Sequence, residues 1–158
     1  MSQSYHEQQD KRIHDKLKGM LNKLPEFCRF FFRGIEPRTE ARTRLAYAYD
    51  LAVFFSFLKS ENPVFRDMDM HELDISALDM INARDIEEYM EYLKYRPDEN
   101  GDDIANRENG IKRKVSSLKS FYRYFYESEM IKTNPAALVH LPKIHDKDIV
   151  RLDYNEVS

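Results

Sequence analysis

The apolar positions of the segment 109–125 recur at the spacing of an α-helix and divide it into two unlike faces. At ~100° per residue, one stripe holds Ile111, Val115, Leu118, Tyr122 and Phe125. The other side interleaves cations with small hydroxyls, as Lys112, Arg113, Ser116, Lys119, Ser120 and Arg123. One face therefore predicts core packing, and the other suits a phosphate backbone and base edges. Most charged helix faces are simply solvated, so this interpretation needs support from the rest of the chain.

Helical spacing continues through the N-terminal part of the chain. Residues 1–9 are polar and aperiodic, so we expect them to be disordered. Apolar side chains at helical spacing predict an amphipathic helix over residues 10–24. A second helix with a strongly apolar side is predicted for residues 25–34, with Pro25 at its start and Gly34 at its end.

Two further helices carry signals at their starts. The segment 39–60 is apolar on nearly all sides, which is typical of a central helix, and the hydroxyl of Thr39 is expected to cap it. Asn82 is predicted to cap a helix over residues 83–95, because Asp85 stands where a capping box has its acid. The first segment places Tyr47, Phe54 and Phe55 on one broad face, and the second places Tyr89 on its inner face.

The remaining segments complete an all-helical order. We expect one helical turn around 76–80, a polar loop over 96–103, a long helix over 107–128, a further turn at 135–138 and an extended linker over 141–158. The sequence therefore predicts an all-α fold, a small orthogonal bundle of four to five helices with an N-terminal helical extension. Almost no strand signal is present.

Composition agrees with helices packed on aromatic side chains. The 158 residues are 42% hydrophobic and 34% charged, with four Gly, ten Tyr, ten Phe and seven Met, which favours one domain with a real core. The chain has no apolar run of about 18 residues, so no membrane partner is expected. The single Cys28 lies in an apolar run and is expected to be a buried, inert thiol in a cytoplasmic protein.

Charge is distributed unevenly although the net value is only −3. Residues 67–103 hold thirteen Asp or Glu against three Lys or Arg, a net −10. Residues 107–132 hold seven Lys or Arg against three Glu, a net +4, and residues 33–44 hold four Arg against two Glu, a net +2. Because salt screens charges beyond ~10 Å, two basic segments can attract a polyanion locally despite the acidic total.

No pattern in the chain indicates an active site. It has no phosphate-binding glycine loop and no metal-ligand spacing among its five histidines. The acids between residues 67 and 103 are of the kind that is more often solvated than catalytic. We therefore expect no cofactor, no metal, no small-molecule substrate and no catalysis by this chain.

Four stretches in order carry a resemblance to a known family. They are TRLAYAYDLAVFFSFL (43–58, with its Asp50-Leu51 pair), INARDIEEYMEYL (81–93), IKRKVSSLKSFYRYF (111–125) and MIKTNPAALVHLPK (130–143). The chain over residues 35–143 thereby resembles the N-terminal core-binding domain, of SAM-like fold, of tyrosine recombinases of the phage-integrase and Xer type. Residues 1–34 then form a tail and helical extension, and residues 144–158 a linker toward a catalytic domain.

The resemblance implies half of a clamp that closes on duplex DNA. In the family the other half carries Arg and His-x-x-Arg residues with a nucleophilic Tyr, and no His-x-x-Arg occurs in this sequence. Tyr154 lies in linker-like sequence without arginine partners, so it is not assigned that role. We expect the parent to be a DNA breaking-rejoining tyrosine recombinase, and this chain to lack strand cleavage.

The family pattern also indicates which residues meet double-stranded DNA. Those expected to face the groove are Arg42, Thr43 and Ala46 from one helix, and Asn109, Gly110, Arg113 and Ser117 from the other. Lys112, Lys119 and Arg123 are expected to hold flanking phosphates. Gly110 replaces the small hydroxyl residue common in the family, which weakens the helix by ~1 kcal/mol and lets the backbone approach the DNA. Tyr124 points toward the polar face, with a phosphate contact and simple exposure equally open.

Three functions follow from these observations. The first is a binding module that places a recombinase on its half-site, with other recombinase subunits as partners in a tetramer on paired sites. The alternative is a helical protein-interaction module without a nucleic-acid role, supported by the acidic segment and the aromatic N-terminal helices. A helix-turn-helix regulator is disfavoured, because the chain lacks the short turn between two compact helices that this motif needs.

Overall fold

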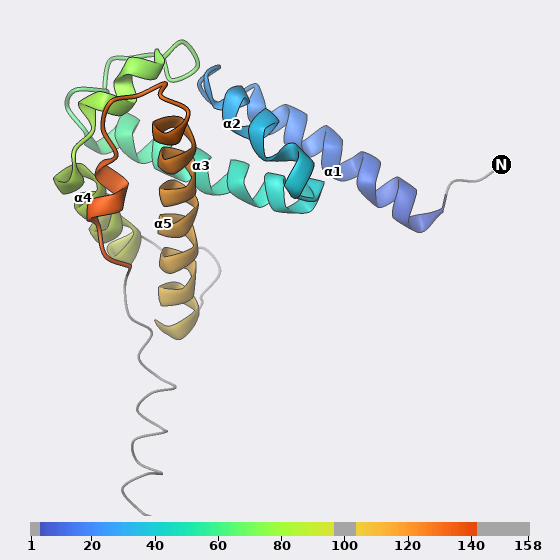
Figure 1. The fold of residues 1–158 in the computed structure, drawn as a ribbon. Coiled ribbons are helices and arrows are strands. Elements are labelled where there is room, and N and C mark those ends of the chain that lie inside the picture. The colour runs from blue at the N-terminus through green and yellow to red at the C-terminus, as the bar shows by residue number, and fades with distance from the viewer. Residues whose placement is uncertain (1–3, 97–103, 142–158) are drawn as a thin grey trace, which may run out of the picture.

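Five α-helices and three short 3-10 turns make up the described part of the chain, and no strand occurs within it (Figure 1). The computed structural model describes residues 4–96 and 104–141. The elements are α1 (Tyr5–Leu21), α2 (Cys28–Ile35), η1 (Glu36–Arg38), α3 (Ala41–Glu61), η2 (Ile75–Met80), α4 (Ala83–Tyr95), α5 (Ile104–Glu127) and η3 (Pro135–Leu138). The predicted all-α class is confirmed. The predicted loop over 97–103 and the linker beyond residue 141 lie outside the described residues.

The helix α3 is central, as its apolar residues on nearly all sides predicted. It contacts α1, α4 and α5, and α5 contacts α2, α4 and η3. In Figure 1, α1 runs beside α3 and continues outward past the bundle, while α5 crosses α3 and α4 lies alongside α5. The α3–α5 crossing therefore brings together segments that are more than sixty residues apart in sequence.

Aromatic rings fill the core around α5. The five residues of the predicted inward stripe are each 8% exposed or less. Phe121, which the stripe did not include, is fully buried and widens it. Its ring lies 5.3 Å from that of Phe31 on α2 and 5.0 Å from that of Phe125, both edge to face. Such edge-to-face pairs add to the free energy of burial, so these rings hold α2 against α5.

A glycine sets how closely α2 approaches α5. A Cβ at Gly34 would overlap the ring of Tyr124, so the two helices can pack at this point only without a side chain there. The prediction that Gly34 ends the helix was wrong, because α2 continues to Ile35. Tyr124 is half-buried and packs edge to face on Phe31, with ring centroids 5.8 Å apart. Its ring contributes to packing between α2 and α5.

The helix starts show which local signals were sufficient. Asn82 and Asp85 form the predicted reciprocal capping box at the start of α4. The expected disorder of residues 4–9 was wrong, because Ser4 and Glu7 form a second capping box and α1 begins at Tyr5. The predicted cap by Thr39 was also wrong: α3 begins at Ala41, and the Thr39 hydroxyl donates instead to the carbonyl of Ile35 at 2.6 Å.

Candidate nucleic-acid interface

The middle of α3 meets α5 at a polar contact built on one buried acid. Asp50 is 3% exposed. Nη2 of Arg113 lies 3.0 Å from its Oδ1, and the hydroxyl of Ser117 donates to its Oδ2 at 2.7 Å. Arg113 nevertheless keeps 62% of its side chain exposed. The contact therefore fixes the register of the two helices and leaves a guanidinium at the surface of their crossing.

Two of the predicted groove residues of α3 lie on the same helix face as Asp50. Thr43, Ala46 and Asp50 are spaced by three and four residues and so share one face of the helix. Thr43 and Ala46 are exposed, as is Arg42 beside them. At ~1.5 Å per residue, Arg42 lies about 12 Å from Asp50 along the helix axis. The first two turns of α3 thus extend a polar, partly cationic surface away from the crossing.

The predicted residues of α5 approach the same point from the other helix. Asn109 and Gly110 lie one turn before Arg113, and Asn109 and Lys112 are exposed. No atom lies within 4 Å of the position of a Cβ at Gly110, so the space beside it is open. The two predicted sets of residues therefore lie on two helices that meet at the Arg113–Asp50 pair.

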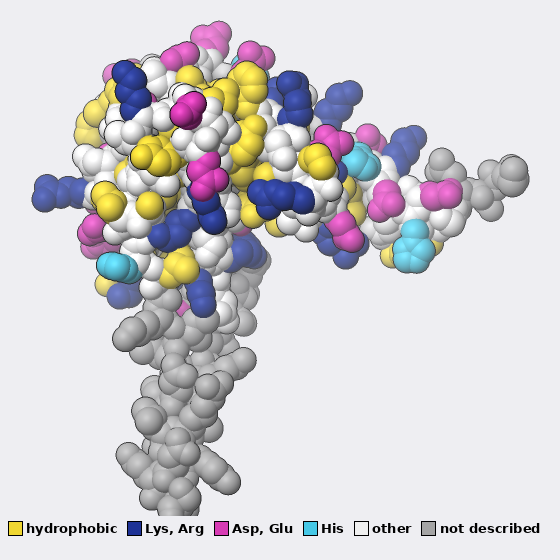
Figure 2. Space-filling view, in the orientation of Figure 1, with side chains coloured by type: hydrophobic (Ala, Val, Ile, Leu, Met, Phe, Trp, Pro, Cys, Tyr) yellow, Lys and Arg dark blue, Asp and Glu magenta, His cyan; other side chains and the backbone are white. Residues whose placement is uncertain are grey.

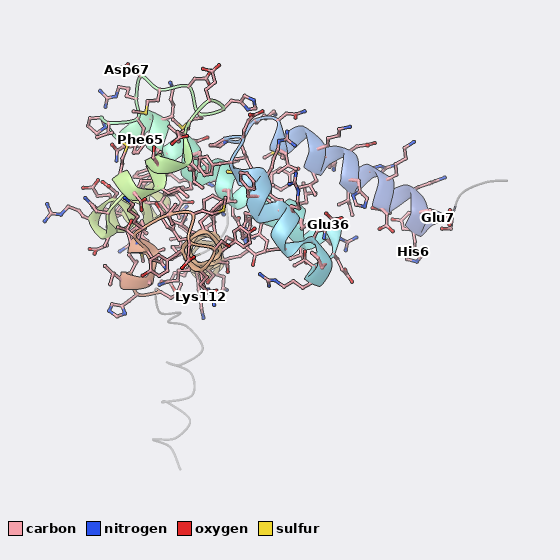
Figure 3. All side chains as sticks on the ribbon, turned by 45° about the horizontal axis from the view of Figure 1, so that its top comes forward. His6, Glu7, Glu36, Phe65, Asp67 and Lys112 are labelled. Carbon is pink, nitrogen blue, oxygen red and sulfur yellow. The ribbon has the colours of Figure 1, made fainter. Side chains whose placement is uncertain are left out.

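Three of the predicted cations are exposed and unpaired within the described residues: Arg42, Lys112 and Arg123. No acid of residues 67–96 forms an ion pair with any of them. In Figure 3, Lys112 lies at one edge of the bundle and Asp67 at the opposite edge. Figure 2 shows several Lys and Arg side chains gathered over and beside the α5 ribbon of Figure 1. Among the described residues, the acids of 67–96 therefore do not neutralise these three cations.

Two other predicted contact residues are engaged inside the protein. Ser117 is 7% exposed and gives its hydroxyl to Asp50. The Nζ of Lys119 donates to the carbonyl of Ala136 at 2.7 Å and also to that of Val139, and desolvation lowers its pKa. These contacts are at odds with a groove-facing Ser117 and with a Lys119 that holds a phosphate. Both side chains fix neighbouring structure instead.

Arg44 shows the same behaviour at the start of α3. This residue contributed to the positive count of residues 33–44, yet it is only 8% exposed. Its guanidinium donates to the carbonyls of Glu36 and Thr39 and to the Thr39 hydroxyl, the last at 3.1 Å. It therefore secures the turn before α3 and leaves Arg42 as the exposed cation of this helix start.

Burial perturbs several titratable groups next to the interface. Burial and the nearby Asp50 carboxylate raise the pKa of Tyr89, whose hydroxyl has no hydrogen-bond partner among the described residues. Desolvation, and then the charge of Arg113, lowers the pKa of the half-buried Lys114. Burial likewise raises the pKa of Cys28, which is fully enclosed as predicted. The raised pKa values keep the Tyr89 hydroxyl and the Cys28 thiol protonated at neutral pH.

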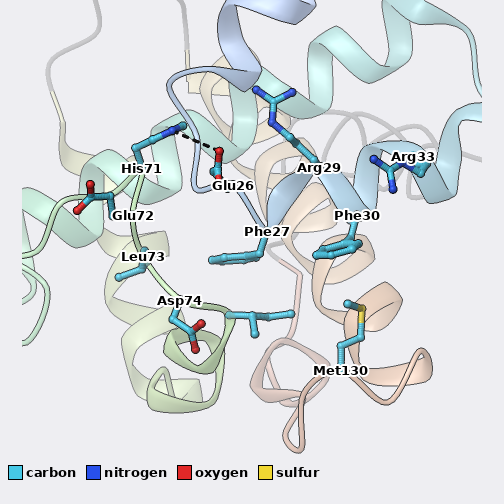
Figure 4. Close-up of a pocket in the computed structure, with 11 residues that line it drawn as sticks. Glu26, Phe27, Arg29, Phe30, Arg33, His71, Glu72, Leu73, Asp74 and Met130 are labelled. Carbon is cyan, nitrogen blue, oxygen red and sulfur yellow. Dashed lines mark ion pairs between the residues drawn. The ribbon is translucent and has the colours of Figure 1, made fainter.

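A groove lies on another face, between α2 and residues 71–75 (Figure 4). Its apolar part is lined by Phe27, just before α2, by Phe30 of α2 and by Met130. A 3.8 Å contact between His71 and Glu26 borders the groove. Over the described ranges 4–96 and 104–141, no cluster of His, Cys, Asp and Glu could hold a metal ion. None of the helices described there has the length and apolarity needed to cross a membrane.

Comparison with known proteins gives several curated relatives of one kind. The tyrosine recombinase XerC of Caldanaerobacter subterraneus subsp. tengcongensis is 34% identical over 137 residues, which are 84% of this chain and 37% of that protein. The XerC of Lacticaseibacillus casei is 34% identical over 70% of this chain and 31% of its own length. That of Chlorobaculum parvum is 30% identical over 75% of this chain and 30% of its own length.

These relatives define the class of protein. The chain carries a tyrosine recombinase domain of the Xer-like type, as its four sequence stretches predicted. It spans about a third of the length of the curated relatives that it matches. No family model matches the chain, and no solved structure matches it.

Proposed function

We propose that this chain is the core-binding domain of a Xer-like tyrosine recombinase and holds the recombination half-site as one half of a DNA clamp. The observation that carries the proposal is the Arg113–Asp50 contact, because it joins the two helices whose outer residues are cationic and unpaired. The major groove of B-DNA is about 12 Å wide, comparable to the ~12 Å between Arg42 and Asp50 along α3. In this proposal the exposed residues of both helices address one groove.

The residues predicted to contact DNA fall into two groups, according to whether their side chains are exposed. In this proposal Arg42, Thr43, Ala46, Asn109, Gly110 and Arg113 face base edges, and Lys112 and Arg123 hold flanking phosphates. Ser117 and Lys119 act from inside, by fixing Asp50 and the segment around η3. Because phosphate contacts supply most of the affinity of such interfaces, binding should weaken steeply with salt.

Strand cleavage belongs, in this proposal, to the parent recombinase and not to the residues of this chain. The partners are duplex DNA of the recombination site and other recombinase subunits in a tetramer on paired sites. The domain boundaries at residues 35 and 143 remain part of the proposal, as does a cytoplasmic location. The support is the relationship to XerC recombinases together with the exposed cations of α3 and α5.

Titration of the chain against a random-sequence duplex at several salt concentrations tests the proposal. We expect a Kd of ~10⁻⁴–10⁻⁶ M, and a log–log salt slope that falls by about one unit in Lys112→Ala and again in Arg123→Ala. Lys23→Ala is the matched control, because this exposed lysine lies in the turn between α1 and α2, away from the interface. Equal slopes for all three variants, or no binding by the wild-type chain, would contradict the proposal.

The alternative of a protein-interaction module is favoured by one observation, the groove of Figure 4. Phe30 is 45% exposed and Met130 37% exposed at its edge, so apolar surface is available there. Exposed apolar side chains of this kind can mark a docking face. Stable self-association without any shift of duplex DNA in a gel at low salt would favour this function instead.

A further inference from the structure

The Asp50–Arg113 pair is unusual in having one fully buried and one largely exposed partner. The Asp50 side chain is 2% exposed, whereas that of Arg113 is 62% exposed. Burying a carboxylate is costly, and a buried ion pair is commonly no more stable than apolar residues of the same volume. Core stability alone therefore gives little reason for an acid in the middle of α3, where the neighbouring Leu51 and Phe54 are apolar and 1% exposed.

We propose that Asp50 is a specificity-determining positioning residue, which orients the guanidinium of Arg113 toward a base edge and neutralises its charge. The inference rests on the proposed DNA-binding function. Arginine carries five N–H donors in a planar fork, and the contact to Asp50 is made by Nη2 alone. The remaining donors stay available in a fixed direction at the surface of the helix crossing.

A second hydrogen bond, from Ser117, holds the Asp50 carboxylate in its orientation toward Arg113. Its Oδ2 accepts from Ser117, one helical turn beyond Arg113, so both carboxylate oxygens are held by α5. The acid cannot rotate away from Arg113 without losing a buried hydrogen bond of 2.7 Å. This explains why Ser117 lies inside the protein. Ser117 orients Asp50, and Asp50 in turn orients Arg113.

Because Asp50 neutralises Arg113 but not Lys112, these two neighbouring residues have different roles in this proposal. Lys112 is exposed and has no ion-pair partner among the described residues, so it acts on any phosphate backbone. Arg113, paired with a buried carboxylate, contributes little net charge and mainly directional hydrogen bonds, which are what distinguish one base from another. Adjacent residues thereby supply affinity and sequence preference separately.

The test is enrichment of sequences from a randomised duplex library, measured beside the salt-dependent affinity for unselected duplex. In Asp50→Asn we expect enrichment to fall on the order of tenfold, the discrimination that one bidentate base contact gives. Affinity for unselected duplex should not fall, and its salt slope should steepen by about one unit because a cation is released. A merely structural loss would instead weaken all duplexes alike.

Two further variants complete the design. Arg113→Lys keeps the charge and removes the fork, so enrichment should fall as in Asp50→Asn while unselected binding stays within about twofold. Lys112→Ala should keep the enrichment and lose affinity for every duplex equally. Circular dichroism establishes that each variant is folded.

The outcomes separate the two proposals. Wild-type enrichment by folded Asp50→Asn overturns the positioning role, even when Lys112→Ala confirms DNA binding. If Asp50→Asn does not fold, Arg113→Lys decides: retained enrichment overturns the role, and lost enrichment with intact unselected binding supports it. A wild-type chain that binds no duplex overturns both the function and the role.

Discussion

Two stretches of α5 carry similar residues on their polar side but present them in opposite ways. Around Arg113 the cation is paired with Asp50 of α3 and keeps most of its side chain in solvent. Six residues further on, Lys119 directs its amine inward to the carbonyls of Ala136 and Val139. The first stretch is an open surface that can meet a partner, and the second is closed on the chain itself.

The difference shows that the role of a helix cation depends on what the rest of the fold places beside it. Near Arg113 the neighbour is a single carboxylate from a crossing helix, which satisfies one nitrogen and leaves the others exposed. Near Lys119 the neighbours are the backbone carbonyls of Ala136 and Val139, in the segment around η3, and both accept from its amine. Four predictions test this contrast.

Arg113→Ala should have the largest effect on stability. It leaves the buried Asp50 carboxylate with Ser117 as its remaining partner, and breaking a buried pair from one side costs about 3–5 kcal/mol. We expect the low end, about 3 kcal/mol, because Arg113 is mostly exposed. Urea denaturation measures it. Adding Asp50→Asn to Arg113→Ala should restore most of the lost free energy of unfolding. If Arg113→Ala alone stays within about 0.5 kcal/mol of wild type, the pair is not coupled.

Lys119→Ala should lower the free energy of unfolding by about 2 kcal/mol, because hydrogen bonds from a charged donor to buried carbonyls are lost. The effect should be local, so amide hydrogen exchange should accelerate most around Ala136 and Val139. Lys112→Ala serves as the control on the open stretch and should stay within about 0.5 kcal/mol. Similar losses for both lysines would remove the distinction between the open and closed stretches.

Tyr89 of α4 and Tyr122 of α5 allow the same comparison between a hydroxyl with a partner and one without. The Tyr122 hydroxyl donates to the carbonyl of Leu78 at 2.9 Å in the core, so Tyr122→Phe should cost about 1 kcal/mol. The Tyr89 hydroxyl is buried without a partner among the described residues, so Tyr89→Phe should be neutral or stabilising. Thermal unfolding of the two variants side by side measures the difference, and a larger loss for Tyr89→Phe would run against it.

The smallest effect concerns pH and the segment that follows α5. Asp79 accepts the N–H groups of Lys132 and Thr133 and the Thr133 hydroxyl. Partial burial acts to raise its pKa, but the hydrogen bonds from Thr133 and Lys132 outweigh it, so the pKa lies below the ordinary 3.8. A lowered folded pKa means that the stabilisation is present at neutral pH and is lost as pH falls through that value.

The corresponding variant is Asp79→Asn. We expect it to be less stable than wild type at neutral pH by less than about 1 kcal/mol, and the difference to disappear below the ordinary pKa of 3.8. Urea denaturation at a series of pH values measures this convergence. A difference that grows as pH falls would mean that the sign of the linkage is wrong.

What the sequence could predict depended on how far apart the interacting residues lie in the chain. The Asn82–Asp85 capping box and the inward stripe of α5 are set by residues within one or a few turns, and both were found. The capping box of Ser4 and Glu7 has the same three-residue spacing and was overlooked because residues 1–9 lack apolar periodicity.

The residues whose contacts differ from the expectation meet partners that helical spacing alone does not show. The family pattern placed Ser117 at the groove and Lys119 at a phosphate, but Ser117 donates to Asp50, which lies 67 residues away along the chain. Thr39 has the right chemistry for a cap, yet the nearby Arg44 guanidinium and the Ile35 carbonyl occupy its hydroxyl. A single sequence contains the residue types but not which of them the tertiary fold brings together.

Labelling of the enclosed Cys28 can report when α2 separates from the rest of the bundle. Cys28 is the only cysteine of the chain and is fully buried, and its raised pKa keeps the sulfur protonated. Thiol reagents attack the thiolate, so labelling must wait until α2 separates from the helices that enclose it. The rate of labelling in native buffer would then follow the openings of this protein without any introduced probe.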